Sequence, residues 1–180
     1  MKRRVIVSIL TVIMIMTMFQ TAAFATDGEG SAAGVSTSPK AAIYLDQQHG
    51  ADSNDGLTKE SAVQSIKKAN ELAKSNHTNA ICLTSLYKVT GEEVWDLGGK
   101  TLHRCGLGGY MIELSNASAS LTMSNVVIDG AECTVDATHA AETDSIIKAA
   151  NGGTIVLKSG AVLQNNKAAQ FGSGILANNG

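Results

Sequence analysis

The chain of 180 residues is mildly acidic, with 14 lysine and arginine residues against 16 aspartate and glutamate residues and a formal net charge of −2. Three of the basic residues lie within the first four positions, so the rest of the chain has 11 basic and 16 acidic residues, a net charge of −5. Nucleic-acid binding depends on clustered lysine and arginine, and this balance argues against it. The 18 glycines, the single proline and the 4% aromatic content suit short strands joined by tight turns.

The first 25 residues have the pattern of a secretory signal peptide. A basic start precedes an apolar run from Val5 to Phe19, and Ala23-Phe24-Ala25 then supplies an A-x-A cleavage site. The alternative is an uncleaved membrane anchor, but polar residues interrupt the run, and a spanning helix needs about 20 predominantly apolar residues. We therefore expect residues 1–25 to be removed, and the chain to be secreted or held at the cell surface, with no membrane segment after cleavage.

The next part of the chain divides into a linker and a capping segment. Residues 26–40 are small, polar and aperiodic, which is typical of a flexible linker. Residues 41–79 begin with a short strand at Ala41–Leu45 and continue in a turn-rich loop. Ser65 can then cap a helix from Ile66 to about Lys74, in which the apolar residues are spaced for one face.

From residue 80 onward, short segments of alternating apolar residues replace the helical pattern. The expected strands are Ile81–Leu83, Tyr87–Val89, Val94–Leu97, Lys100–His103, Ile112–Leu114, Leu121–Met123, Val126–Ile128, Ile147–Ala149, Ile155–Leu157, Ala161–Leu163 and one that begins at Ile175. They lack the hairpin signals that would indicate a β-sandwich. Three short strands per turn, with glycine or asparagine at the corners, predict an all-β fold, a parallel β-helix solenoid in residues 80–180.

Three of these segments repeat one another, at offsets of 35 and 28 residues: Ile112–Asn116, Ile147–Asn151 and Ile175–Asn179. Repeats of about 20–50 residues indicate solenoids, propellers or arrays. Stacking would place Ile112, Ile147 and Ile175 in one inward ladder, and Leu114, Ala149 and Ala177 in another. Asn116, Asn151 and Asn179 would form a structural ladder at a corner, because asparagine tolerates left-handed φ and stacked amides can hydrogen-bond.

Three cysteines follow the signal peptide: Cys82, Cys105 and Cys133. An odd number excludes a closed disulfide framework within one chain. Their spacings of 23 and 28 residues are close to one repeat, so two of them could stack in neighbouring coils. Two interpretations stay open: small buried apolar residues, or one disulfide, for which the required geometry is strict.

The first candidate site is the loop from Asp46 to Asp55. Asp52, Asn54 and Asp55 offer oxygen atoms of the kind that a calcium ion takes, although the spacing does not fit an EF-hand. The competing interpretation is that Asp52 and Asn54 hydrogen-bond their own turn and fix the entry into the helix. Apart from calcium, no cofactor is expected.

The second candidate is the insertion between two coils, from Gly130 to Ser145. It contains four carboxylates and a histidine, with no lysine or arginine: Glu132, Asp136, His139, Glu142 and Asp144. Insertions in solenoids form loops on one face, often the binding face, so these residues could bind a cation or act on a glycan. The alternative is a solvated acidic loop, because charge runs are usually exposed.

Several segments resemble a known family: Ile43–Leu45, Gly50–Thr58 and Ser65–Ala69 look like the opening of pectate-lyase-like right-handed β-helix proteins, and Leu97–Leu102 resembles their first full coil. Leu163–Ala168 with Gly172–Ile175 is similar to the repeats of bacterial surface adhesins and polymorphic outer-membrane proteins. These are turn and stacking residues, so the resemblance implies a fold more than an activity. It implies a right-handed parallel β-helix with a short N-terminal capping helix and an uncapped C-terminal end.

Lyases of that superfamily use calcium-binding acids with a basic residue as proton acceptor. Arg104 is the only arginine after the signal peptide, and the sequence places no acid beside it, which argues against catalysis. We therefore expect a non-catalytic module of an exported adhesin-type protein that binds a polysaccharide or a cell-surface glycan. The alternative is a fragment of a polysaccharide lyase or glycoside hydrolase without its catalytic coils. The uncapped coil predicts self-association at that end.

Overall fold

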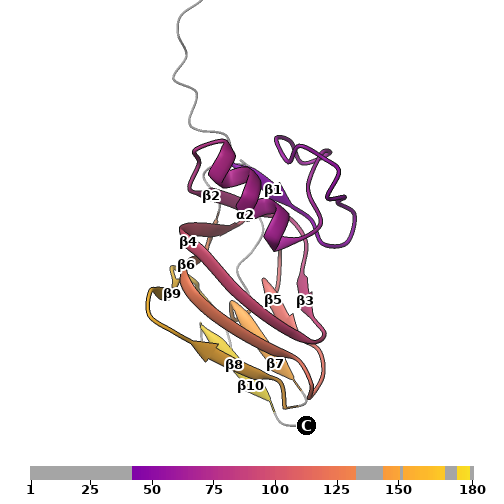
Figure 1. The fold of residues 1–180 in the computed structure, drawn as a ribbon. Helices are drawn as coiled ribbons and strands as arrows, with labels where there is room; N and C mark the ends of the chain where they lie inside the picture. The colour runs from indigo at the N-terminus through magenta and orange to yellow at the C-terminus, as the bar shows by residue number, and fades with distance from the viewer. Residues whose placement is uncertain (1–41, 133–143, 151, 169–173, 179–180) are drawn as a thin grey trace, which may run out of the picture. The chain divides into compact units, whose positions relative to one another are not determined.

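The computed structural model describes residues 42–132, 144–150, 152–168 and 174–178, all of which lie in one compact unit, Thr37–Gly180 (Figure 1). The predicted signal peptide and linker, residues 1–25 and 26–40, lie outside the described residues. Within the described ranges, no helix is long and apolar enough to cross a membrane.

Among the described residues, parallel β-strands dominate, together with one helix, α2 (Ile66–Ser75). The strands are β1 (Ile43–Leu45), β2 (Ala80–Leu83), β3 (Tyr87–Val89), β4 (Glu92–Arg104), β5 (Ile112–Leu114), β6 (Ser120–Glu132), β7 (Ile147–Ala150), β8 (Thr154–Leu157), β9 (Ala161–Gln164) and β10 (Ile175–Asn178). The helix and the strand positions agree with the sequence pattern. The differences concern β4 and β6: each runs on through a corner at which two separate strands were expected, β4 begins earlier, at Glu92, and β6 extends to Glu132, inside the expected insertion.

The strands stack in three columns, and every pairing between them is parallel. The first column contains β3, β5, β7 and β10. The second contains the N-terminal parts of β4 and β6 together with β8. The third contains β1, β2, the C-terminal parts of β4 and β6, and β9. The chain visits the columns in this order again and again, so each passage adds one layer to the stack.

The register of the first column confirms the two predicted ladders. Ile112 pairs with Ile147, which pairs with Ile175, and the same pairings align Leu114, Ala149 and Ala177. Because successive side chains of a strand point to opposite faces, these aliphatic side chains share the inner face. Glu113 and Lys148 lie between them on the outer face, where their charged atoms are 3.1 Å apart. Charge pairing between layers was not expected from the sequence.

Left-handed residues form the corner between the second and third columns. Gly98 (φ 60°) and Gly99 (φ 82°) lie at this corner in β4, Asn125 (φ 46°) occupies it in β6, and Gly160 (φ 76°) precedes β9. The amide of Asn125 also donates hydrogen bonds to the carboxylate of Asp96 in the preceding layer, at 3.1 and 3.2 Å. This corner therefore combines a backbone that only glycine or asparagine readily adopts with a polar contact between layers.

The left-handed backbone expected at Asn116 is not found, because φ is not positive there. The Asn116 amide instead donates to the carbonyl of Thr90 at 3.1 Å, and its oxygen accepts from the Ser118 N–H at 2.9 Å. Local hydrogen bonding alone thus accounts for an asparagine at this turn. Asn151 and Asn179 lie outside the described residues, so the complete ladder stays a prediction.

Helix α2 starts where the sequence predicts. The Ser65 hydroxyl accepts a hydrogen bond from the Lys68 N–H at 3.1 Å, which satisfies one of the free donors of the first turn. Ile66, Ala69 and Ala73 form the buried face of the helix. They belong to the same apolar core as the inner side chains of the columns.

Residues 56–63 cover the outer edge of β1. The Tyr44 N–H donates to the Gly56 carbonyl at 2.8 Å, and the Val63 N–H donates to the Tyr44 carbonyl at 3.0 Å. The Asp46 N–H completes the contact by donating to the Val63 carbonyl at 2.9 Å. The N-terminal end of the stack is therefore already paired.

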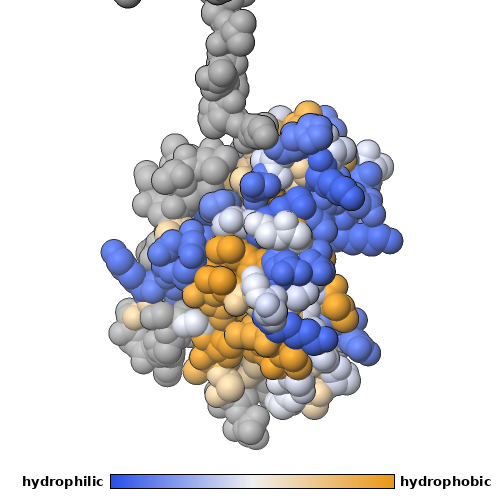
Figure 2. Space-filling view, turned by 60° about the vertical axis from the view of Figure 1, so that its left-hand side comes forward, coloured by the Kyte–Doolittle hydropathy of each residue, from blue (hydrophilic) through white to orange (hydrophobic). Residues whose placement is uncertain are grey.

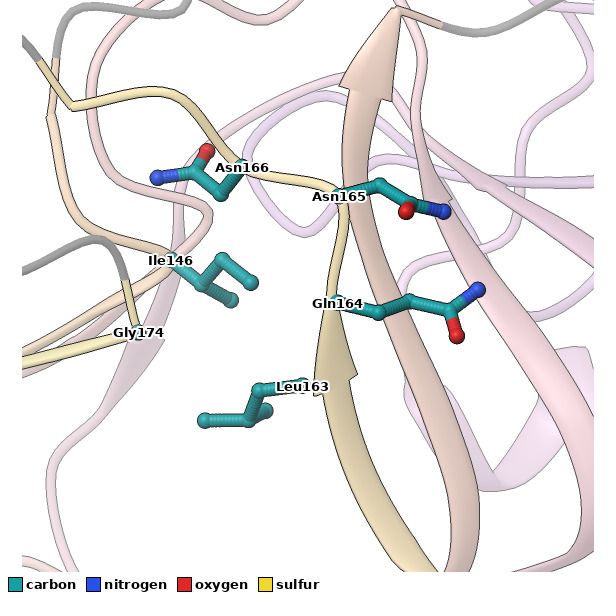
Figure 3. Close-up of a pocket in the computed structure, with 6 residues that line it drawn as sticks. All are labelled: Ile146, Leu163, Gln164, Asn165, Asn166 and Gly174. Atoms are coloured by element: carbon teal, nitrogen blue, oxygen red, sulfur yellow. The ribbon is translucent and has the colours of Figure 1, made fainter.

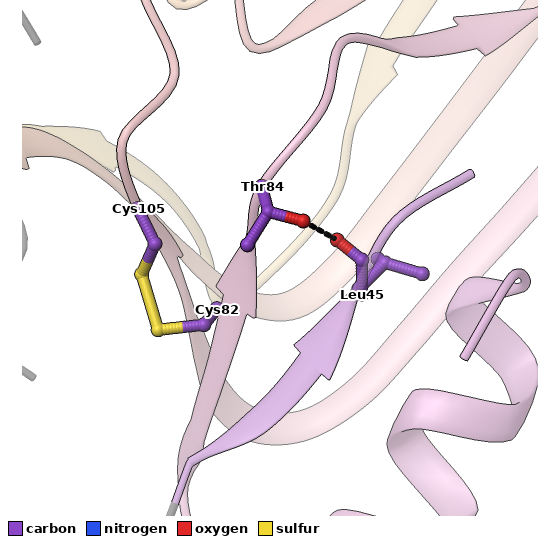
Figure 4. Close-up of a disulfide and its surroundings, with 4 residues drawn as sticks. All are labelled: Leu45, Cys82, Thr84 and Cys105. Carbon is purple, nitrogen blue, oxygen red and sulfur yellow. Dashed lines mark hydrogen bonds between the residues drawn. A yellow bond between two sulfur atoms is a disulfide. The ribbon is translucent and has the colours of Figure 1, made fainter. Parts of the chain in front are cut away.

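A disulfide joins Cys82 to Cys105, with the two Cα atoms 5.5 Å apart (Figure 4). Both cysteines are fully buried on the outer side of the third column, where half-buried Tyr44 packs against them. Beside them, the Thr84 hydroxyl donates to the Leu45 carbonyl at 3.2 Å. Of the two interpretations left open for the cysteines, the disulfide is the one found. Cys133 lies outside the described residues.

Candidate ligand-binding face

A row of polar side chains runs along the outer face of the third column. His103 on β4 pairs with Asp129 on β6, which pairs with Gln164 on β9. The residues before them, Leu102, Ile128 and Leu163, belong to the core or pack against it. The alternation of a strand then requires the three polar residues to face outward. We call His103, Asp129, Gln164 and the adjacent Asn165 the polar row.

Asp129 is the centre of the hydrogen bonding in the polar row. Its Oδ2 atom accepts from the amides of Gln164 and Asn165, both at 3.0 Å, and its Oδ1 atom accepts from the Ala131 N–H at 3.0 Å. Partial burial by itself would raise the pKa of the carboxyl, but these hydrogen bonds and the nearby His103 bring it below its ordinary value. The group is therefore a carboxylate at neutral pH and acts only as an acceptor.

His103 provides the complementary group. Burial lowers the pKa of the half-buried ring, and the Asp129 charge only partly offsets this. At pH 7 the ring is therefore mainly neutral, with one nitrogen that donates and one that accepts. Within the described residues, the ring makes no hydrogen bond.

An apolar row lies beside the polar row. Thr101, Val127 and Val162 occupy the outward positions two residues earlier on the same strands, and Val162 is 42% exposed. Neighbouring strands are about 4.8 Å apart. The face thus offers a line of hydrogen-bonding groups and a parallel line of methyl groups, with the same spacing along both. This combination suits a flat, extended ligand with hydroxyl groups along one edge.

A small pocket lies on the other side of β9. Figure 3 shows the side chains of Ile146 and Leu163 directed into it, whereas Gln164 and Asn165 point away, toward the outer face. Asn166 also borders the pocket, but its amide is engaged with the chain itself: it accepts from Arg104 at 3.1 Å and donates to the Asp144 carbonyl at 2.8 Å. Gln164 and Asn165 therefore border this pocket, but their side chains are directed to the outer face, where the polar row lies.

The loop predicted as a calcium site is held together by its own hydrogen bonds. Asp52 accepts from the N–H groups of Gln64 (2.9 Å) and Ser65 (2.8 Å), and from the Ser65 hydroxyl (2.6 Å). Asp55 accepts from the N–H of Leu57 at 3.0 Å, and it accepts from a serine hydroxyl at 2.6 Å.

Asn54, the third residue proposed for calcium, donates from its amide to the Ala62 carbonyl at 2.9 Å. Asp52 and Asn54 thus act as the structural interpretation expects, and Asp55 hydrogen-bonds within the same loop, which leads into α2. Among the described residues, no group of three or more histidine, cysteine or acidic side chains is arranged to hold a metal ion. Calcium binding at this loop stays a hypothesis.

Most of the second predicted site cannot be placed. Asp136, His139 and Glu142 lie outside the described residues, and so does the side chain of Glu132. Asp144 is described, and its carbonyl accepts the hydrogen bond from Asn166 noted above. A role of this insertion in binding therefore stays a prediction.

Arg104 has a role that the sequence did not reveal. The residue is 1% exposed, and its guanidinium donates to the carbonyls of Gly130 (3.0 Å), Leu107 (3.0 Å) and Gly109, as well as to Asn166. These partners come from β6 and from the segments that follow β4 and β9, so one side chain ties three layers together. A lone arginine in a strand pattern was the only available signal.

The polar row was also missed, although a signal existed. Aligning the strands Lys100–Arg104, Val126–Gly130 and Ala161–Asn165 places histidine, aspartate and glutamine at the same position, after an inward leucine or isoleucine. Only the register makes them neighbours. Comparisons with known proteins give no further guide, since no family model, curated protein or solved structure matches this chain.

Proposed function

We propose that this chain is a right-handed parallel β-helix module of an exported adhesin-type protein, and that it binds glycans without cleaving them. The fold part of the proposal is supported by the three parallel columns and by their repeated order along the chain. The right hand is the one that crossover connections between parallel strands almost always take. The likeness to pectate-lyase-like proteins and surface adhesins, seen in turn and stacking residues, supports the same assignment.

The observation that carries glycan binding is the polar row beside the apolar row. The Asp129 carboxylate accepts from hydroxyl groups, the neutral His103 ring both donates and accepts, and the Gln164 amide does the same. The neighbouring methyl groups suit the C–H face of a sugar ring. Because the strand spacing is close to the length of one sugar unit in an extended polysaccharide, successive layers can contact successive units. A glycan would therefore lie along the axis of the stack.

Export is supported by the N-terminal pattern and by the disulfide, since disulfides persist mainly in oxidising compartments. Expression in a bacterial host with N-terminal sequencing of the product tests this part. Recovery outside the cytoplasm with Thr26 as the first residue is expected. A product that stays in the cytoplasm with Met1 intact would refute it.

Binding can be tested on an array of bacterial and host glycans, followed by calorimetry on the best ligand. Asp129→Ala and Gln164→Ala should each weaken binding by about tenfold or more, equivalent to about 1.4 kcal/mol. Thr122→Ala is the matched control, because Thr122 faces outward on β6 in the second column. Equal affinity for all variants, or no bound glycan, would overturn the proposed face. Release of shortened or unsaturated sugars would instead establish the lyase or hydrolase alternative.

A further inference from the structure

Asp129 is held in place by its neighbours, and they leave part of its hydrogen-bonding capacity unused. A carboxylate offers about four lone pairs to donors. Gln164 and Asn165 both donate to Oδ2, and the Ala131 N–H donates to Oδ1. Among the described residues, no other donor reaches this carboxylate, so Oδ1 keeps a lone pair for a ligand. The group that fits there must carry a proton, as a sugar hydroxyl does.

The same hydrogen bonds orient the two neighbouring amides. Because the nitrogen of each amide donates to Asp129, the oxygen atoms of Gln164 and Asn165 remain as further acceptors. Asn165 reaches its position through a left-handed backbone, with φ 58°, which asparagine tolerates better than most residues. Both amide residues are exposed. The row thus presents mainly acceptors, and acceptors pair with hydroxyl groups rather than with carboxylates or sulfates.

Positive charge is missing from this face. In the described part of the chain, no lysine or arginine occupies an outward position of the third column. Arg104, next to His103 on β4, is buried and donates to backbone carbonyls. Lys100 donates to a carbonyl of the preceding corner at 3.0 Å. The nearest lysine along the chain is exposed Lys167, two residues beyond the polar row. With a neutral His103 ring, the row itself carries one negative charge.

We propose that the polar row selects uncharged glycans, and that Asp129 excludes those with carboxylate or sulfate groups. This inference rests on the proposed function of the same face. A hydroxyl donates to the remaining lone pair of Asp129, whereas an anionic group in its place brings acceptors and like charges together. Figure 2 shows apolar side chains gathered beside hydrophilic ones on the surface of the stack. An uncharged sugar, with hydroxyl edges and C–H faces, matches such a surface without a counter-charge.

The test compares chemically matched pairs of oligosaccharides by calorimetry on the purified chain. The probes are soluble β-1,4-linked glucan, mannan and galactan oligosaccharides, each beside the same material after oxidation of its C6 hydroxyls to carboxylates. All titrations are done at neutral pH in EDTA, so that no divalent cation bridges two carboxylates. We expect at least one neutral probe to bind, and its oxidised partner to bind at least about tenfold more weakly.

Two further measurements assign this selection to Asp129. Raising the salt from about 50 to about 500 mM shortens the Debye length from roughly 14 to roughly 4 Å, and should bring the two affinities closer together. Asp129→Asn should do the same at low salt, whatever its affinity for the neutral probe. Glu92→Gln is the matched control, because exposed Glu92 lies in the second column. It removes the same charge from the chain but should leave the ratio of the two affinities unchanged.

Two results would overturn the inference while leaving glycan binding intact. One is an oxidised probe that binds at least as tightly as its neutral partner; loss of that binding in Lys167→Gln would identify an anion site at the lysine. The other is a neutral preference that persists at high salt and in an Asp129→Asn variant with wild-type circular dichroism, which would assign the selection to another surface. If neither member of any pair binds, the inference fails together with the proposed function.

Discussion

Removing the Cys82–Cys105 cross-link should lower stability by an amount that follows from the position of the bond in the chain. The disulfide spans 23 residues and ties β2 to the end of β4 in the next layer. Closing a loop of this length in the unfolded chain corresponds to about 3.4 kcal/mol at 25 °C by the loop-entropy relation. For a unit of the size of Thr37–Gly180, this equals a decrease of roughly 11 °C in the midpoint of thermal unfolding.

The assay compares three forms by urea and thermal unfolding: the oxidised chain, the same chain after reduction under denaturing conditions and refolding with reductant, and the Cys82→Ala/Cys105→Ala pair. The reduced chain is the matched control, because it keeps both sulfur atoms and so separates the cross-link from the loss of buried volume. Both cysteines are fully buried, so reductant should not open the bond until the chain unfolds. Thiol titration of the oxidised, denatured chain should count a single thiol, that of Cys133.

Three titrated thiols in the oxidised chain would refute the disulfide itself. Equal unfolding midpoints, within about 2 °C, for the oxidised and reduced chains would instead refute the stability argument. In that case the first layers would already be ordered in the unfolded ensemble, so that the cross-link removes little entropy from it.

Three further predictions concern single side chains. Arg104→Met leaves buried carbonyls without donors, so the free energy of unfolding in urea should fall by about 3 kcal/mol. The control variant, Lys158→Met at an exposed position, should lower it by less than about 0.5 kcal/mol. Equal effects of the two variants would contradict the role of the guanidinium. Gly130→Ala would place its Cβ atom 2.6 Å from a facing amide oxygen and should destabilise by about 1–3 kcal/mol, whereas Gly91→Ala, which meets nothing within 4 Å, should be neutral. The lowered pKa of Asp129 means that its ionised form stabilises the fold above the unfolded pKa of about 3.9, and that this contribution is lost as the pH falls through the folded pKa. Asp129→Asn should therefore lower the thermal midpoint at pH 7, and this difference should shrink as the pH falls below about 3.9; a difference that stays constant into acid would argue against this.

The elements of the fold could be predicted because their signals are local. Alternating aliphatic residues marked the strands, and Ser65 marked the start of α2, where it forms the expected cap. The repeat of Ile112, Ile147 and Ile175 also predicted the register of the first column correctly, because an inward position in one layer must be inward in the next. The continuity of β4 and β6 through their corners was missed, since Gly98 and Asn125 read as breaks in a strand pattern.

The candidate face was far less accessible to prediction. The loop around Asp52 drew attention because its carboxylates are close in sequence, yet its hydrogen bonds serve the entry into α2. His103, Asp129 and Gln164 are separated by one layer each, and nothing local relates them. Their relation depends on the number of residues in each corner and insertion, which shifts the register of every later strand.

By itself, the sequence determined the strands, the helix cap and the inward ladders, because period, turn chemistry and capping act over a few residues. Only the tertiary structure decided which cysteines pair, where the Arg104 guanidinium finds its acceptors, and which side chains form the polar row. These features depend on contacts between layers, and such contacts exist only after the corners have brought distant segments into register. The physical reason is that the residues of each layer specify it locally, whereas its contacts with the neighbouring layers form only in the assembled stack of parallel strands.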